Sequence, residues 1–236
     1  MDMSNNHIRA KHRRVLLFVR APEMGKVKTR LEKHIHSDTV LALYRHFVED
    51  ILNTLNSGGY DTIVFFTPPD REALVQEWLG KHVPILPQTG DSLGRKMRNA
   101  FSTVFASGAN QAVLMGSDFP DLDICIVDEA FASLQEKHMT IGPAKDGGYY
   151  LIGFRADTFR ERIFSNIDWG TSCVFAQTIA QIKVATISCH FLPPWNDIDT
   201  YEDLVAFYDR NNTMTQRQGP LKTMRCLNQL FRKGSL

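Results

Sequence analysis

The sequence contains neither a long apolar run nor an excess of one charge. No apolar segment approaches the ~20 residues that a membrane-spanning helix needs, so we expect no membrane span. The 27 Lys and Arg residues nearly equal the 26 Asp and Glu residues, and the formal net charge is +1. A chain without a strong positive field is poorly suited to nucleic acid or to an anionic membrane surface, and we expect neither as a partner.

The sequence is also poor in cysteine, and its cysteines follow no pattern. No C-x-x-C spacing occurs, and no His stands at a ligand spacing from the four cysteines, which are Cys125, Cys173, Cys189 and Cys226. This distribution argues against a cysteine-based metal site and favours reduced thiols. The first 14 residues are polar and basic, and no apolar signal segment follows them. These features predict a cytoplasmic protein.

The 236 residues are 43% hydrophobic and 22% charged, as in an ordinary globular protein with a sizeable core. Short apolar runs alternate with amphipathic helical segments; the runs lie at 15–19, 62–67, 83–86, 112–115, 150–154 and 184–191. This alternation predicts an α/β protein, a three-layer αβα sandwich with a mainly parallel, mixed sheet. We expect a flexible basic N-terminus (1–13), a single domain (14–209), and a basic tail or terminal helix (210–236).

A basic loop follows the first predicted strand. It carries Arg20, Lys28 and Arg30 around Pro22 and Gly25, but it matches neither the P-loop nor the G-x-G-x-x-G pattern. In an α/β protein, the loop after the first strand is a common position for the phosphates of a nucleotide. The alternative is an ordinary solvated loop.

Two acidic segments complement this loop. Asp118 and Asp121 follow the run 112–115, and a carboxylate just beyond the carboxyl end of a strand can hold a divalent ion that binds phosphate oxygens. Alternatively, these residues only form a turn. In the second segment, Asp197 and Asp199 flank Ile198, so in an extended chain both carboxylates point the same way. The alternative there is a helix cap, because Thr200 with Asp203 resembles a capping box.

Three further loops, around Gln88, Trp169 and Asp146, contain candidate binding residues. The amide of Gln88 could read a nucleotide base, with Gly90 and Gly94 allowing close approach, although the same loop also fits a helix start. A lone Trp169 could stack on an acceptor or simply pack in the core.

The segment Asp146-Gly147-Gly148 has two interpretations. It is a turn signal, which favours a β-hairpin. It also removes side chains from the backbone, so that a sugar could lie against it while Asp146 binds a hydroxyl group.

Taken as an ordered set, five motifs between roughly Val15 and Tyr208 resemble the glycosyltransferase-A-fold (SpsA-like) nucleotide-diphospho-sugar transferase superfamily, including a bacterial family with arsenosugar-biosynthesis-type glycosyltransferase members. The motifs lie at 18–31, 90–97, 116–122, 142–153 and 197–200. More distantly, the chain resembles the guanylyltransferases for molybdenum cofactor and 2-phospho-lactate. It departs from these in one place, because Ala21-Pro22 replaces the Gly-Gly pair of their opening loop.

The resemblance implies a site for a nucleotide and Mg²⁺ or Mn²⁺. In this superfamily the first loop binds phosphates, and aspartates after the central strand and late in the domain bind the metal. The nucleotide residues would be Arg20, Ala21, Pro22, Gly25, Lys28, Arg30, Gln88, Gly90, Gly94 and Ser117. The metal ligands would be Asp118 with Asp197 or Asp199. The sugar or acceptor residues would be Gly147, Gly148, Tyr149 and Trp169. The catalytic residues would be Lys28, Asp118 and Asp146.

These expectations lead to three functional hypotheses. The first is a metal-dependent glycosyltransferase that uses a nucleotide-diphosphate sugar and a small-molecule acceptor, with Asp146 as general base if the reaction inverts configuration. The second is a nucleotidyltransferase that joins a nucleoside triphosphate to a phosphorylated acceptor and releases pyrophosphate. The third is a non-catalytic nucleotide-binding protein. The sequence identifies neither the base, the sugar and the acceptor nor the oligomeric state.

Overall fold

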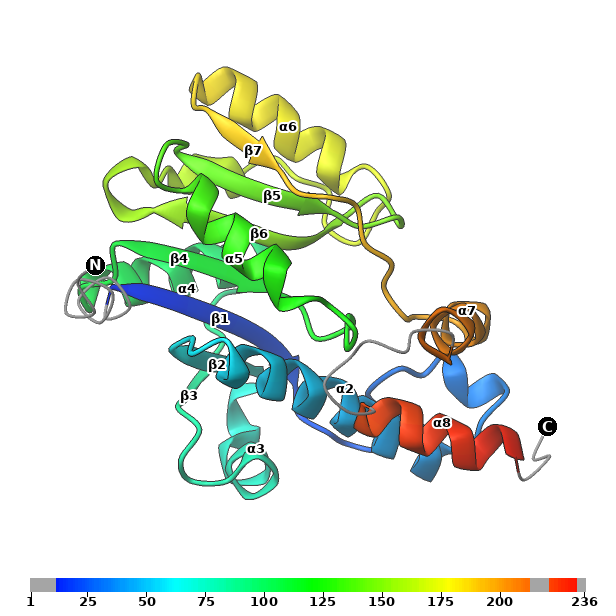
Figure 1. Cartoon of the computed structure of the whole chain (residues 1–236). Helices are drawn as coiled ribbons and strands as arrows, with labels where there is room; N and C mark the ends of the chain where they lie inside the picture. The colour runs from blue at the N-terminus through cyan, green and yellow to red at the C-terminus, as the bar shows by residue number, and fades with distance from the viewer. Residues whose placement is uncertain (1–11, 213–220, 233–236) are drawn as a thin grey trace, which may run out of the picture.

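The computed structural model describes residues 12–212 and 221–232, and a mixed sheet lies at its centre in the order β3-β2-β1-β4-β6-β5-β7 (Figure 1). The strands are β1 (Arg13–Arg20), β2 (Thr62–Thr67), β3 (Ile85–Pro87), β4 (Gln111–Met115), β5 (Met139–Pro143), β6 (Tyr149–Arg155) and β7 (Cys189–Phe191). Only β6 runs antiparallel to its neighbours. This sheet confirms the predicted α/β fold.

The central strands are apolar on both sides because helices cover both faces of the sheet. In β1, Val15 and Leu17 belong to one core, whereas Leu16 and Phe18 belong to the other. The helices are α2 (Ser37–Ser57), α3 (Glu72–Leu79), α4 (Leu93–Ala106), α5 (Ile124–Ser133), α6 (Val174–Ala185), α7 (Tyr201–Asn212) and α8 (Lys222–Arg232). Helices α2, α3 and α5 pack on the first face, and α4 and α6 pack on the second.

The strand predicted over 184–191 is shorter in the structure. Helix α6 continues to Ala185, Thr186 adopts a left-handed conformation (φ 54°), and β7 begins only at Cys189. The apolar residues of this stretch therefore belong to two elements, which periodicity over so short a run does not separate.

A third core lies beside the sheet, where α7 and α8 pack against α2 (Figure 1). Leu43 and Phe47 on α2 are buried there, whereas Tyr44 and Val48 on the same helix belong to the first core, so α2 is apolar on two faces. The buried Asp50 carboxylate accepts hydrogen bonds from the backbone N–H groups of Lys222 and Thr223 at 2.9 Å. The first N–H groups of a helix have no partner within the helix, so a carboxylate that accepts from them stabilises α8.

The expected flexible segment 1–13 lies outside the described residues, apart from 12 and 13. Within the expected tail 210–236, residues 210–212 end α7 and 222–232 form α8. None of the helices in the described ranges combines the length and apolar character needed to cross a bilayer.

Asp121 connects the loop after β4 to α7 and to the segment before it. Its carboxylate is 2% exposed and lies 2.7 Å from Arg210 Nε, 3.0 Å from Asn211 Nδ2 and 3.1 Å from Trp195 Nε1. Burial alone would raise the pKa of Asp121, but these donors hold it below its ordinary value. Of the two carboxylates after β4, Asp121 therefore serves the fold rather than a ligand site.

We predict that Asp121→Ala lowers the free energy of unfolding by about 3 kcal/mol, because it leaves the Arg210 guanidinium without its buried partner. The matched control is Asp61→Ala, which removes an exposed partner of Arg14 (61% side-chain exposure) and should cost less than about 1 kcal/mol. Urea unfolding measures both values. Equal losses in the two variants would contradict the structural role of Asp121.

Candidate active site

The strand directions bring the predicted loops to one edge of the sheet. Strands β1 and β4 are parallel neighbours, so the loops after Arg20 and Met115 emerge side by side. Strands β5 and β7 also end at this edge, because β6 is antiparallel to both β4 and β5. In open α/β sheets, ligands bind at the carboxyl ends of the strands.

A cavity of about 310 Å³ lies between the loop after β1, the loop after β4 and the segment before α7. It brings together most of the predicted phosphate and metal residues; those lining it are Arg20, Lys28, Arg30, Ser117, Asp118 and Asp199. Tyr44 and Lys26 also line the cavity. One wall is therefore basic and the other acidic.

Lys28 lies between the two acidic groups. Its Nζ is 2.7 Å from Asp118 Oδ1 and 2.7 Å from Asp199 Oδ1, and its side chain is 6% exposed. Burial by itself lowers the pKa of Lys28, but the two carboxylates more than offset this and hold it above its ordinary value. Burial by itself raises the pKa of Asp199, but the charge of Lys28 and its hydrogen bond hold this pKa below its ordinary value.

The backbone of Lys28 is strained, with φ at 47° in the left-handed region. For a residue with a side chain this conformation costs roughly 1–2 kcal/mol. Val27 and Leu31 on either side are buried, so they anchor the loop from below and keep Lys28 at the cavity. A strained residue held by packing at a charged cavity is typical of a functional position.

Tyr44, on α2, fixes the start of this loop. Its hydroxyl group accepts a hydrogen bond from Arg20 N (2.8 Å) and donates one to Arg20 O (2.9 Å). In the sequence, Tyr44 is one of several apolar positions repeated at helical spacing between residues 41 and 55. A buried tyrosine needs a polar partner, but nothing in the sequence identifies that partner.

A second cavity of about 750 Å³ adjoins the first and shares Asp118, Arg30 and Asp199 with it. The predicted acceptor residues Tyr149, Trp169 and Gly148 line this cavity, as do Asp146 and Asp197. Asp146 lies in the turn between β5 and β6, where its carboxylate accepts a hydrogen bond from Gly148 N (2.8 Å). The β-hairpin and the exposed Asp146 are thus both present.

Asp197 and Asp199 have different surroundings. Asp199 and Asp118 both contact Lys28 Nζ. Asp197 has no such contact with Lys28; burial, and to a smaller extent repulsion from Asp146, raises the pKa of Asp197 to about 6. The predicted capping box of α7 is confirmed: Thr200 Oγ1 accepts a hydrogen bond from Asp203 N, and the Asp203 carboxylate accepts hydrogen bonds from Thr200 N and Thr200 Oγ1. One alternative held that this segment only caps a helix. The Asp199 carboxylate contacts Lys28 instead, so it has a role beyond the cap.

Four predicted nucleotide or sugar residues have structural roles instead: Gln88, Gly90, Gly94 and Gly147. Gln88 is 6% exposed, and its amide donates to the carbonyl groups of Val19 and Phe65. It lines neither of the two cavities, so this geometry does not place it for base recognition.

The two glycines Gly94 and Gly147 make room for protein groups. A Cβ atom at Gly94 would lie 2.7 Å from the Trp169 ring, and one at Gly147 (φ 91°) would lie 2.2 Å from Ser172 O. Gly90 (φ 129°) sits in the turn before α4, where a Cβ atom would crowd Arg95. These positions need glycine for packing and turn geometry, and none of the three lines either of the two cavities.

The donor groups fit a metal ion that arrives with phosphate. Within the residues that the structure describes, no three His, Cys, Asp or Glu side chains come together as a metal-binding group. Asp118 and Asp199 nevertheless converge on one cationic atom, Lys28 Nζ. Mg²⁺ commonly takes only one or two protein carboxylates and completes its shell with phosphate oxygens and water, so this pair suffices for a metal–nucleotide complex.

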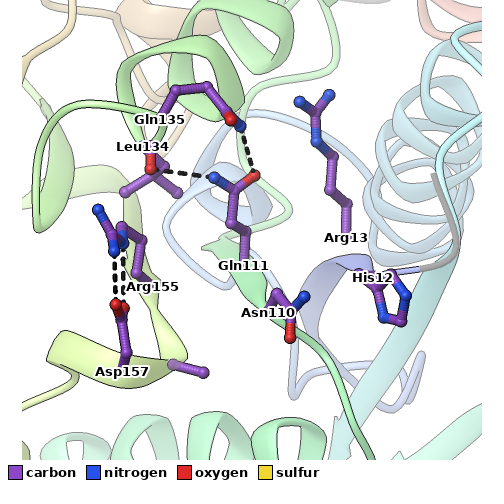
Figure 2. Close-up of a pocket in the computed structure, with 9 residues that line it drawn as sticks. His12, Arg13, Asn110, Gln111, Leu134, Gln135, Arg155 and Asp157 are labelled. Carbon is purple, nitrogen blue, oxygen red and sulfur yellow. Dashed lines mark hydrogen bonds and ion pairs between the residues drawn. The ribbon is translucent and has the colours of Figure 1, made fainter. Parts of the chain in front are cut away.

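A further cavity, of about 540 Å³, lies at the opposite ends of the strands, beside the starts of β1 and β4. Figure 2 shows the residues that line it. Its polar groups are largely satisfied by one another: Gln111 donates to Leu134 O, Gln135 donates to Gln111, and Arg155 pairs with Asp157. It lacks the acidic pair of the first site, and it lies at the amino ends of β1 and β4 instead of their carboxyl ends.

Comparisons with known proteins agree with this fold. The family model described as "Uncharacterized protein conserved in bacteria (DUF2064)" matches residues 51–171. No curated protein matches the chain. The chain is similar to the crystal structure of a "putative nucleotide-diphospho-sugar transferase" from Desulfovibrio desulfuricans G20, with 38% identity over 94% of this chain and 96% of that chain and a TM-score of 0.89.

Two more distant structures share the fold alone. A cytidylyltransferase from Leptospira borgpetersenii is 14% identical, with 95% of each chain covered and a TM-score of 0.57. A manganese complex from Mycobacterium tuberculosis H37Rv is 13% identical, with 84% of this chain and 98% of that chain covered and a TM-score of 0.52. The chain therefore belongs to the DUF2064 family of bacterial proteins, within the nucleotide-diphospho-sugar transferase superfamily that its motifs resemble.

Proposed function

We propose that the protein is a metal-dependent transferase that binds a nucleotide-diphosphate sugar and transfers the sugar to a small-molecule acceptor. The observation that carries this proposal is the convergence of Lys28 and Arg30 with Asp118 and Asp199 beside a cavity of about 750 Å³. Support also comes from the name of the 38% identical relative. A basic wall facing an acidic pair suits a diphosphate that carries a divalent ion.

The residues of the first cavity would have two roles. Arg20, Lys28 and Arg30 would bind the diphosphate oxygens and stabilise the charge that develops as the diphosphate leaves. Asp118 and Asp199 would hold Mg²⁺ or Mn²⁺, which supplies further charge stabilisation to the same leaving group.

The larger cavity would hold the sugar and the acceptor. Trp169 and Tyr149 give it an aromatic wall, and Gly148 leaves the backbone open. One oxygen of Asp146 is engaged by Gly148 N, so the other could accept a proton from an acceptor hydroxyl group. Asp146 would then be the general base of an inverting transfer.

Nucleotidyl transfer is the alternative. Arg20 and Lys26 are exposed on the same cavity as Lys28 and Arg30, and four cations also suit a triphosphate. Against this, Ala21 and Pro22 are buried, so the loop lacks the open Gly-Gly backbone of the guanylyltransferases. The ligand that binds decides between the two reactions.

We predict that a nucleotide-diphosphate sugar together with Mn²⁺ raises the thermal stability of the protein. Ligand at ~100 times its Kd stabilises by about 2.7 kcal/mol. The stabilisation should be lost with a chelator and in Asp118→Asn and Asp199→Asn, but retained in Asp123→Asn, which changes an exposed helix cap. Differential scanning fluorimetry across nucleoside triphosphates and nucleotide-diphosphate sugars measures this.

The outcomes separate the hypotheses. A shift with triphosphates alone would replace glycosyl transfer by nucleotidyl transfer. A shift that ignores both Mn²⁺ and Asp118 would leave a non-catalytic nucleotide-binding protein, and the absence of any shift would refute the nucleotide site.

Asp197 gives a prediction about pH. Because its folded pKa is raised to about 6, the folded protein binds more protons than the unfolded chain between about pH 4 and 6, and the contribution of Asp197 to stability falls as pH rises through this range. In metal-free buffer, Asp197→Asn should therefore be more stable than wild type at pH 7.5, by about 1 kcal/mol after allowing for solvent screening of a half-buried group.

The gain should shrink towards pH 4, where the carboxyl is protonated in the folded state and about half protonated in the unfolded chain. Thermal unfolding with chelator at pH 4.5, 6 and 7.5 tests this, with Asp123→Asn as the control. A stability difference that does not change with pH would contradict the assignment.

A further inference from the structure

We infer that Lys28 makes metal binding depend on phosphate: in the free protein its ammonium group takes the place of the metal between Asp118 and Asp199, and phosphate oxygens draw it away when a nucleotide binds. This inference rests on the proposed metal–nucleotide site and adds that the metal binds tightly only together with phosphate. The acidic pair would bind a divalent ion weakly alone and tightly with phosphate.

The geometry gives the ammonium group the contacts of a bound cation. A single atom, Lys28 Nζ, lies 2.7 Å from one oxygen of each carboxylate. A divalent ion held by both carboxylates would use these same oxygens at roughly 2.0–2.6 Å. An ion and the ammonium group cannot both approach the two oxygens this closely, so they compete.

Charge strengthens this competition. The cluster of Lys28, Asp118 and Asp199 has a formal net charge of −1, and Arg30 Nη1 adds a further cation 3.7 Å from Asp199 Oδ2. A divalent ion that enters this cluster meets two positive groups and a half-neutralised acidic pair. Because the Lys28 side chain is buried, water screens this repulsion only partly.

Phosphate reverses the balance. Arg20 and Lys26 are exposed on the same cavity and can bind phosphate without leaving a carboxylate. Phosphate oxygens then offer Lys28 a new partner and offer the metal additional ligands. The loop backbone need not move, because the buried Val27 and Leu31 hold it while the flexible lysine stem swings. Metal and phosphate should therefore increase each other's affinity by the same factor.

Direct Mn²⁺ binding tests the inference on the full chain. Free Mn²⁺ is measured by electron paramagnetic resonance during titration of wild type, Lys28→Met and Lys28→Gln, with and without pyrophosphate, and a protein-free titration corrects for Mn²⁺ held by pyrophosphate itself. The control for the titration without pyrophosphate is Lys26→Met, which removes the same charge from an exposed position of the same loop. Circular dichroism verifies that each variant is folded.

We expect both Lys28 variants to bind Mn²⁺ without pyrophosphate about tenfold more tightly than wild type, whereas Lys26→Met changes the affinity less than about threefold. In wild type, pyrophosphate should increase Mn²⁺ affinity about tenfold or more, and this coupling should shrink in the Lys28 variants. Asp199→Asn combined with Lys28→Met should abolish the gain.

Two results would overturn the inference. One is unchanged or weaker Mn²⁺ binding in the folded Lys28 variants; the other is wild-type protein that binds Mn²⁺ equally well with and without pyrophosphate, a result that needs no variant. The proposed function fails separately, when no nucleotide stabilises wild type in the presence of Mn²⁺, whatever the Lys28 variants show.

Discussion

The contacts of Lys28 with Asp118 and Asp199 join the parts of this site. They connect the loop after β1, the loop after β4 and the segment before α7, and Lys28 and Asp199 are 171 residues apart in the chain. Without the ammonium group, two carboxylates would face each other across a cavity that is only partly open to water. Without the carboxylates, burial would lower the pKa of Lys28, and the side chain would either lose its proton or move into water. Each side of the cavity therefore depends on the other.

The scaffold brings these groups together and holds them there. Parallel pairing of β1 with β4 sets two of the loops side by side, and the antiparallel β6 turns the chain so that β5 and β7 deliver their loops to the same edge. Asp121 then fastens α7 to the loop after β4, and Tyr44 holds the backbone of Arg20 against α2. These contacts fix the positions of the loops that carry the charged groups of the cavity.

The site also contains features that oppose stability. Lys28 occupies a left-handed conformation, and Asp197 is half buried and repelled by Asp146. Strain and unmatched charge of this kind persist when the surrounding core is strong enough to hold them. Here, the two cores on the faces of the sheet and the third core under α7 and α8 provide that support. In the proposed function, a divalent ion and phosphate would offset the repulsion among the carboxylates of the site.

The sequence by itself determined the fold class and the chemistry of the main loops. Strands buried on both faces must be short apolar runs, so β1, β2 and β4 were visible as such. A basic loop after one such run and two aspartates after another predicted Lys28 and Asp118 as members of one site, and the structure places them in contact.

Only the tertiary structure decided which polar side chains face that site. Gln88, Gly94 and Gly147 were assigned to ligands, yet they serve backbone carbonyl groups, an indole ring and a neighbouring turn. Asp197 and Asp199 could not be distinguished in sequence, and Tyr44 was one apolar helix position among several. The physical reason is the same for each: a hydrogen bond or a steric contact depends on a partner that folding brings from a distant part of the chain, whereas strand and helix patterns depend on near neighbours.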